Sequence, residues 1–209
     1  MNLDRRRFLQ VLAAGMAAGP GHAAPALGGG KTYTYKAAGG CEIKADVHGA
    51  VEAGTRRPVI LWIHGGALIM GGRGLNTGPG RYPVLTDLYL KAGYTIVSID
   101  YRLAPETKLP GIIEDVQDAW RWVREKAPNL VRIDPERIGV SGGSAGGYLT
   151  LMTGFCVQPR PCALVSLYGY GDVVGPWYSR PDPFYSRQPA VVSHAYERAL
   201  EWMEKYVRG

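Results

Sequence analysis

Gly142-Gly143-Ser144-Ala145-Gly146 is the stretch of this 209-residue chain that says most about its fold. It follows the apolar run Arg137-Ile138-Gly139-Val140-Ser141, which is typical of a strand buried in a sheet. Gly-x-Ser-x-Gly between a strand and a helix predicts a nucleophile elbow, a sharp turn that presents a serine hydroxyl. A serine attacks only when a base takes its proton and nearby amides stabilise the oxyanion that forms. The stretch therefore predicts a strand–turn–helix unit with Ser144 as a candidate nucleophile.

Outward from the elbow, buried strands alternate with helices. Val59–Ile63 and Thr95–Ile99 are apolar throughout, as in strands that are covered on both faces of a parallel sheet, and Ala163–Leu167 is a third such run. Helical spacing of apolar residues covers Tyr82–Ala92, Pro110–Ala127, Ala145–Phe155 and, near the end, Tyr196–Val207. This alternation predicts an α/β fold with a mostly parallel sheet and helices on both faces.

A hairpin precedes these elements. Lys31–Lys36 and Cys41–His48 each alternate between polar and apolar residues, and Gly39-Gly40 lies between them. The pattern predicts two antiparallel strands with one face in water. The complete prediction is one α/β domain over residues 31–209 that begins with an antiparallel hairpin.

The first 26 residues read as a signal peptide. The charged segment Asp4-Arg5-Arg6-Arg7 comes before Phe8-Leu9, a short apolar run follows, and small residues surround Ala23–Ala26. Paired arginines followed by Phe-Leu resemble a twin-arginine (Tat) leader, which exports folded proteins. The apolar run is shorter than the ~20 residues of a bilayer span, so no stable membrane span is expected after leader removal. A periplasmic or secreted protein is expected.

Composition excludes several classes of function. The net charge is +6, but the basic residues are scattered among acidic ones, whereas nucleic-acid binding requires a basic patch. The three cysteines neither pair evenly nor have the spacing of a zinc site. A Cys156–Cys162 bridge and free thiols both remain open. No metal or organic cofactor is expected.

A second motif, His64-Gly65-Gly66-Ala67, follows the apolar run Val59–Ile63. Glycines let backbone N–H groups come close to a substrate oxygen, which a side chain would prevent. Together with the N–H of Ala145, the residue after the serine, the amides of Gly65 and Gly66 would form an oxyanion hole. Donors of this kind are worth roughly 3 kcal/mol each in the transition state.

A third segment, Asp100-Tyr101-Arg102-Leu103-Ala104-Pro105-Glu106, completes a family pattern. With the His-Gly-Gly loop and the Gly-Ser-Ala-Gly-Gly elbow, the chain resembles α/β-hydrolases of the hormone-sensitive-lipase and bacterial feruloyl-esterase-like group over Thr32–Asp172. The resemblance implies that Ser144 is the nucleophile and that Gly65, Gly66 and Ala145 supply the oxyanion hole. It also implies that His64 orients the loop, while Asp100 and Arg102 fix the turn structurally.

The chain departs from the family after the elbow. In the family, the acid and then the base follow the serine, on loops after two further strands. Beyond Ser144 the only aspartates are Asp172 and Asp182, the only histidine is His194, and no further buried strand is evident after Leu167.

Two interpretations stay open. In the first, Asp172 is the acid and His194 the base, which preserves the order of the triad. In the second, the chain is a shortened and catalytically poor relative whose exposed sheet edge needs covering, for example by a homodimer.

The sequence therefore carries more than one hypothesis of function. The first is a serine carboxylic-ester hydrolase that forms an acyl-enzyme on a small-molecule ester, with short acyl, feruloyl or acetylated-carbohydrate esters as substrates. A peptidase like the prolyl oligopeptidases is a variant of the same chemistry. The other is a non-catalytic remnant or binding protein that keeps the pocket without a working triad.

Overall fold

The computed structural model of the chain describes residues 30–50, 54–75, 83–173, 175 and 187. The chain divides into two compact units, Met1–Gly171 and Asp172–Gly209, and every strand and helix given below lies in the first. The leader and the helix expected near the end fall outside the described residues, so both stay predictions, as does the single domain over 31–209. None of the helices in the described part is long and apolar enough to cross a bilayer.

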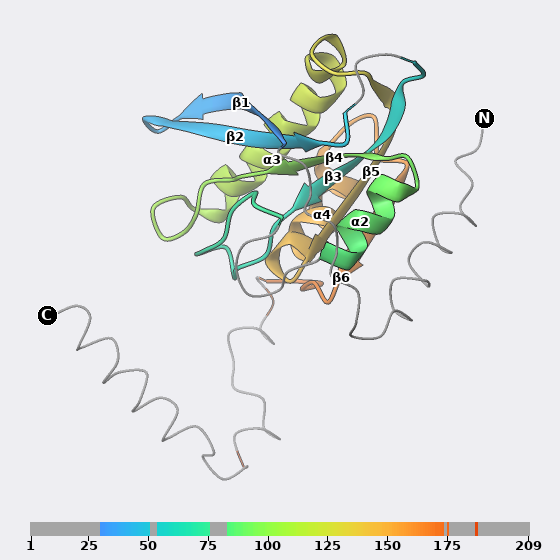
Figure 1. The fold of residues 1–209 in the computed structure, drawn as a ribbon. Coiled ribbons are helices and arrows are strands. Elements are labelled where there is room, and N and C mark those ends of the chain that lie inside the picture. Colours follow the sequence, from blue (N-terminus) through green and yellow to red (C-terminus); the bar gives the residue numbers. More distant parts are fainter. Residues whose placement is uncertain (1–29, 51–53, 76–82, 174, 176–186, 188–209) are drawn as a thin grey trace, which may run out of the picture. The chain divides into compact units, whose positions relative to one another are not determined.

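A six-stranded sheet forms the centre of the first unit, in the order β1-β2-β4-β3-β5-β6 (Figure 1). β1 pairs with β2, and β2 with β4, in antiparallel fashion, whereas β4, β3, β5 and β6 run parallel to one another. The predicted mostly parallel sheet with a leading hairpin is confirmed. The strands are β1 (Lys31–Ala38), β2 (Cys41–His48), β3 (Arg57–Ile63), β4 (Thr95–Ile99), β5 (Ile133–Gly143) and β6 (Ala163–Leu167).

The hairpin has the turn that its two glycines predict. Gly39 and Gly40 have φ angles of 59° and 77°, and two consecutive left-handed residues make the turn that best matches the twist of a hairpin. Along β2, Ile43, Ala45 and Val47 are buried while the residues between them keep contact with solvent. One face of the hairpin therefore packs on the core and the other is wet.

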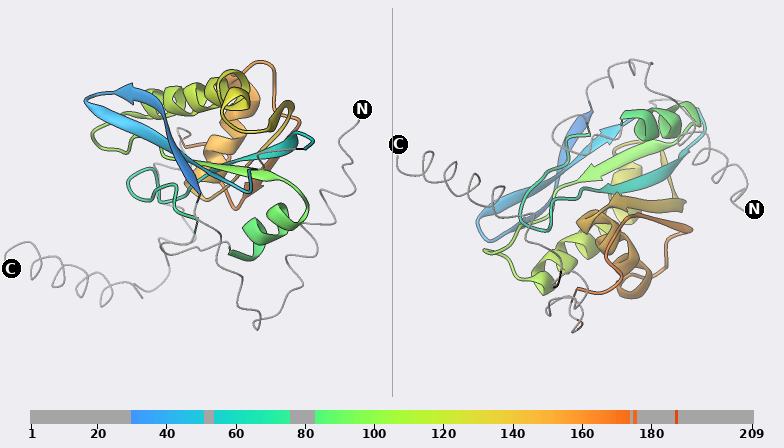
Figure 2. Two further views of the ribbon diagram at one scale, coloured as in Figure 1. Left: turned by 45° about the horizontal axis from the view of Figure 1, so that its top comes forward. Right: turned by 90° about the horizontal axis from the view of Figure 1, so that it is seen from below.

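Helices cover both faces of the sheet. α2 (Pro83–Lys91) lies on one face, and α3 (Leu109–Glu125) and α4 (Ala145–Cys156) lie on the other (Figure 2). This cover explains why all of β4 is buried. α2 ends at a left-handed glycine, Gly93 (φ 86°), whose N–H donates to the Leu90 carbonyl while that of Tyr94 donates to the Tyr89 carbonyl. Both bonds satisfy carbonyls that the last helical turn leaves unpaired.

β5 starts earlier than the apolar pattern predicts. In its pairing with β3, Arg57 lies opposite Ile133 and Val59 opposite Ile138, so the residues between form an irregularity in β5. There the Asp134 carboxylate accepts hydrogen bonds from the Glu136 N–H (3.0 Å) and from Arg137 Nε (2.6 Å). Charged residues and a proline hide this half of the strand from an apolar pattern.

β6 is the last strand at its side of the sheet in the part of the chain that the structure describes. Leu164 on this strand is 37% exposed. The prediction of a homodimer through this edge stays a prediction. The cysteine question is resolved: Cys41, Cys156 and Cys162 are all free thiols, and Cys41 and Cys162 are exposed.

Candidate active site

Ser144 lies at the junction of β5 and α4 in a backbone conformation that is rare for a side chain. Its φ and ψ angles are 57° and −122°, and such strain persists only where the surroundings enforce it. Here the Ser144 N–H donates to the Leu167 carbonyl at the end of β6 (2.9 Å), and its carbonyl accepts from the Tyr148 N–H (3.1 Å). The side chain makes no capping hydrogen bond to the helix. The turn is thus fixed on both sides while the hydroxyl is not used to hold it.

The two outer glycines of the motif allow β3 to end against the elbow. A Cβ on Gly142 would lie 2.5 Å from the Ile63 carbonyl oxygen and 2.6 Å from that of Gly146. A Cβ on Gly146 would lie 2.6 Å from the His64 carbonyl oxygen. All of these are backbone atoms that cannot move aside cheaply. The sequence Gly-x-Ser-x-Gly is therefore required by packing at this junction as well as by the turn.

The His-Gly-Gly loop lies directly beside the serine. A Cβ on Gly65 would come within 2.8 Å of the Gly143 carbonyl oxygen and 3.3 Å of Ser144 Cβ. Ala145, the expected donor on the other side of Ser144, is fully buried and is the first residue of α4. The N–H groups in the first turn of a helix have no partner within the helix and carry its positive dipole. Two elements that bear backbone donors thus meet at Ser144.

The tip of the loop is a tight, strained turn. The Gly66 carbonyl accepts from the N–H groups of Ile69 and Met70, at 3.0 Å each, and Gly66 has a φ of 114°. Ala67 and Leu68 follow with φ angles of 54° and 66°, a region that residues with side chains seldom adopt. Non-glycine residues in this region cluster at binding and catalytic sites, where surrounding contacts hold them.

His64 is buried at the base of the loop, with 7% of its surface exposed. Its Nδ1 lies 2.7 Å from the Gly65 carbonyl oxygen, and its ring stacks on Tyr101 with 4.2 Å between ring centres. The Tyr101 hydroxyl donates to the His64 carbonyl at 2.9 Å. Burial lowers the pKa of His64 below its usual value, although the Gly65 carbonyl opposes that effect, so the neutral ring is favoured at pH 7. These contacts bind the ring to the loop; its role in orienting the loop stays a prediction.

The segment after β4 supports the loop from outside. The Ala104 N–H donates to the Leu68 carbonyl at the loop tip (2.8 Å). The Asp100 carboxylate accepts from Arg73 at the end of the loop, and its backbone carbonyl accepts from the Tyr35 hydroxyl of β1 (2.6 Å). Asp100 therefore connects the hairpin to the loop.

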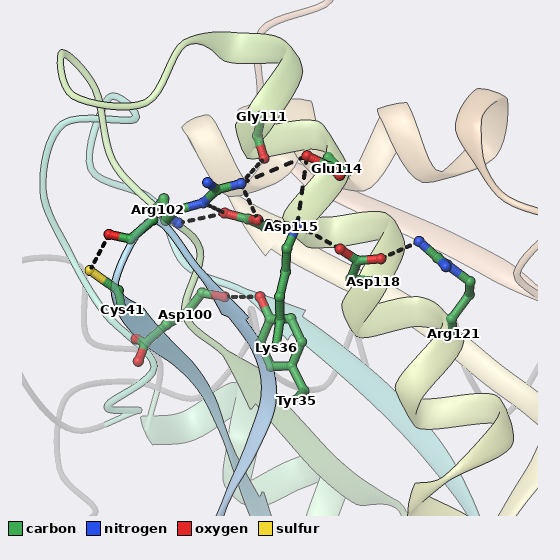
Figure 3. A network of polar contacts seen from close by, with 11 residues as sticks. Tyr35, Lys36, Cys41, Asp100, Arg102, Gly111, Glu114, Asp115, Asp118 and Arg121 are labelled. Atoms are coloured by element: carbon green, nitrogen blue, oxygen red, sulfur yellow. Dashed lines mark hydrogen bonds and ion pairs between the residues drawn. The ribbon is translucent and has the colours of Figure 1, made fainter.

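Arg102 belongs to a buried charge network in which it and Lys36 converge on Asp115 of α3 (Figure 3). Arg102 Nε and Nη2 bind the two oxygens of Asp115 at 2.8 and 2.7 Å, and Lys36 Nζ lies 2.8 Å from Oδ1. Asp115 is fully buried. Burial alone would raise the pKa of Asp115, but hydrogen bonds from Arg102 and Lys36 outweigh it and lower the pKa. The network holds α3, β1 and the segment after β4 together.

The described residues do not test the expected acid and base. Asp172 opens the second unit, where its Oδ1 accepts from the Gly175 N–H at 3.0 Å. His194 lies outside the described residues. The assignment of both residues stays a prediction. No group of three His, Cys, Asp or Glu side chains that could hold a metal ion occurs among the residues that the structure describes.

Sequence patterns pointed to the motifs but not to the residues that hold them. Arg73 binds Asp46 and Asp100, and Asp115 binds Arg102. The fold brings these partners together, because they are not neighbours in the sequence. Asp46 lies 27 residues before Arg73, and Asp100 lies 27 residues after it. The only local signal was Gly71-Gly72 before Arg73, which marks a close approach of the backbone.

Comparisons with known proteins identify the family of the chain. The BD-FAE family model matches residues 45–161, more than half of the chain. The non-reducing polyketide synthase ausA of Aspergillus calidoustus is 33% identical over 166 residues, which make up 73% of this chain and 6% of the synthase. The chain thus spans a small part of that much longer protein.

Esterase 2 of Thermogutta terrifontis is similar in structure. Its apo form has a TM-score of 0.50 and 27% identity, over 60% of this chain and 46% of the esterase. Its butyrate-bound form has a TM-score of 0.55 and covers 77% of this chain and 62% of the esterase, at 22% identity, which bears on the fold alone. The chain spans about half to two thirds of the length of that enzyme. On the family match and these structures, the chain belongs to the BD-FAE family, an esterase family with the α/β-hydrolase fold.

Proposed function

We propose that this chain is a serine carboxylic-ester hydrolase that works through an acyl-enzyme on Ser144. The observation that carries the proposal is the contact of Gly65 with the elbow, where a Cβ would lie 3.3 Å from Ser144 Cβ. It brings the backbone donors of the loop and of α4 next to one strained serine whose side chain takes no part in capping the helix. A nucleophile beside preorganised amides is the arrangement that acyl transfer requires.

In the proposed reaction, Ser144 Oγ attacks the ester carbonyl carbon while a base takes its proton. The N–H groups of Gly65, Gly66 and Ala145 donate to the oxyanion. The bond from carbon to the alcohol oxygen then breaks, the base returns the proton to the leaving alcohol, and the acyl group stays on Ser144. Water hydrolyses the acyl-enzyme by the same steps. We assign the base to His194 and its acid partner to Asp172, because their order after Ser144 is that of the family.

Hydrolysis of p-nitrophenyl acetate and butyrate tests the nucleophile. Ser144→Ala is expected to lower kcat by at least about 10⁴-fold, as in triad enzymes that lose their serine. Ser141→Ala is the matched control, since this serine lies three residues before Ser144, in β5, and is fully buried. Turnover that survives Ser144→Ala overturns the proposal. An inactive wild type that also resists a fluorophosphonate probe would favour a non-catalytic protein.

The base and acid are tested separately. His194→Gln and Asp172→Asn should each lower kcat by roughly 10³-fold or more, and the double variant should be little worse than either, because triad members act as a unit. If both variants keep full activity while Ser144→Ala abolishes it, the base lies elsewhere in the chain.

For the substrate, we propose short acyl, feruloyl and acetylated-carbohydrate esters. The membership of the chain in an esterase family supports an ester over an amide. A panel of methyl ferulate, acetylated xylan, short p-nitrophenyl esters and a p-nitroanilide peptide ranks these classes by kcat/KM. Preference for the anilide would instead favour a peptidase.

We also propose export to the periplasm or beyond by the Tat pathway, because of the consecutive arginines Arg5-Arg6-Arg7 before Phe8-Leu9. A fusion of residues 1–30 to a reporter should reach the periplasm, and substitution of all three arginines by lysine should keep it in the cytoplasm. Export that is unaffected by the triple substitution would refute the Tat assignment.

A further inference from the structure

The loop that starts at His64 returns to the sheet at Arg73. Gly71, on the returning arm, has a φ of 108°, and a Cβ there would lie 2.5 Å from His64 Nδ1 and 2.6 Å from the Gly65 carbonyl oxygen. The two arms of the loop therefore run in close contact, with no space for a side chain between them. Whatever fixes residues 71–73 also fixes His64 and Gly65.

Arg73 is fixed by four polar contacts that use both its backbone and its side chain. Its Nε donates to Asp46 Oδ1 at 2.9 Å and its Nη1 to Asp100 Oδ2 at 2.5 Å. Its N–H donates to Asp100 Oδ1 at 2.8 Å, and its carbonyl accepts from Ser98 Oγ at 2.7 Å. The guanidinium fork binds the two carboxylates through two separate nitrogens in a fixed plane, a geometry that the single nitrogen of a lysine does not reproduce.

The partners of Arg73 are held by the sheet itself. Asp46 of β2 and Ser98 of β4 are directly paired residues of neighbouring strands. Thr32 of β1 donates to Asp46 Oδ1 at 2.6 Å, and the Asp100 N–H donates to the Lys44 carbonyl at 2.9 Å. The acceptors therefore stand in place whether or not Arg73 occupies them.

We propose that Arg73 is a positioning residue for the oxyanion hole. By holding the returning arm on Asp46 and Asp100, it keeps the N–H groups of Gly65 and Gly66 at the distance from Ser144 that catalysis requires. The inference rests on the proposed function. Two other attachments, Tyr101 at His64 and Ala104 at Leu68, remain when Arg73 is removed, so the loop stays folded but less exactly placed.

Steady-state kinetics of Arg73→Ala, Arg73→Lys and a control variant test the proposal. Because a displacement of about 1 Å can cost about 10²-fold, we expect Arg73→Ala to lower kcat by about 10- to 100-fold with KM within about twofold. Arg73→Lys should lie between Arg73→Ala and the wild type. A loss that falls on KM alone, or an unchanged kcat, overturns the proposal.

Arg137→Ala is the matched control. Arg137 also pairs its Nε with a carboxylate, that of Asp134, at 2.6 Å, and the exposed fractions of the two arginine side chains are 33% and 30%. Arg137 lies in the early half of β5, and the extended strand between it and Ser144 separates it from the elbow by roughly 20 Å. The kcat of Arg137→Ala should stay within about twofold of the wild-type value. An equal loss in both variants would overturn the proposal, because it would show only the general cost of removing an ion pair.

Amide hydrogen exchange separates this inference from the proposed function. In Arg73→Ala, exchange in a peptide covering residues 64–72 should quicken, whereas a peptide covering residues 57–63 of β3 should not change. Unchanged exchange in the loop overturns the role of Arg73 even in an active enzyme. A wild type without activity that depends on Ser144 refutes the proposed function, and the exchange data then still decide whether Arg73 holds the loop.

Discussion

Gly65→Ala is the substitution that most directly tests the contact between loop and elbow. The added Cβ would lie 2.8 Å from the Gly143 carbonyl oxygen, about 0.6 Å short of the 3.4 Å at which ordinary contact begins. The Cβ is fixed to the backbone of the loop and the oxygen belongs to the backbone of the elbow, so the loop must move away from Ser144 by about that amount. Oxyanion donors act at 2.7–3.1 Å, and a shift of this size takes at least one of them out of range. Loss of one donor costs about 10²- to 10³-fold in kcat.

The assay is p-nitrophenyl butyrate hydrolysis, with thermal unfolding followed on the same samples. We expect kcat to fall by about 10²-fold or more and stability to fall by about 1–3 kcal/mol, the usual cost of overpacking. Gly139→Ala is the control, since Gly139 lies in β5 and its Cβ would meet its nearest neighbours, Ala163 and Ile60, at an ordinary contact distance of 3.6 Å. If Gly65→Ala keeps kcat within twofold of the wild type, the loop does not press on the elbow and the reasoning is refuted.

Three further predictions concern the supports of the site. Tyr101→Phe removes the donor to the His64 carbonyl, so the free energy of unfolding in urea should fall by about 1–2 kcal/mol; no loss would mean that this bond contributes nothing. Asp115→Asn leaves Arg102 and Lys36 without their buried carboxylate, and unfolding at pH 7 should become about 3–5 kcal/mol easier. The pKa of Asp115 is lower in the folded than in the unfolded chain, so its ionised form stabilises the fold above about pH 3.9. That stabilisation is lost as the pH falls through the folded pKa. Below about pH 4, the stability of Asp115→Asn should therefore vary less with pH than that of the wild type. Burial lowers the pKa of His64 in the folded chain, so the stabilisation of the fold by the neutral ring is present above about pH 6.5 and is lost as the pH falls further. His64→Asn should flatten the fall in stability below about pH 6.5, measured by circular dichroism, and an unchanged slope would contradict a neutral His64.

The elements of this fold could be predicted from local sequence because each has its own periodicity. The hairpin has alternating residues and a Gly-Gly turn, and β3, β4 and β6 are short apolar runs. The first half of β5 could not be predicted, because Asp134 and Arg137 pair with each other at an irregularity in the strand. Such a segment looks like a turn until its partner strand is known.

The candidate site shows the same division. The elbow and the His-Gly-Gly loop are contiguous motifs whose glycines are required by contacts at the junction, so the sequence identifies them. Arg73 and its carboxylate partners come from three separate segments that only the strand order brings together. The left-handed conformation of Ala67 and Leu68 is equally hidden, because nothing in these residue types favours it.

Mapping the covalent adduct of a fluorophosphonate probe tests the central claim most directly. The account predicts that the wild type takes up one probe molecule, on the peptide that contains Ser144, and that Ser144→Ala takes up none while Ser141→Ala is labelled like the wild type. Labelling of another residue, or a wild type that stays unlabelled under conditions where a known serine esterase reacts, would contradict it.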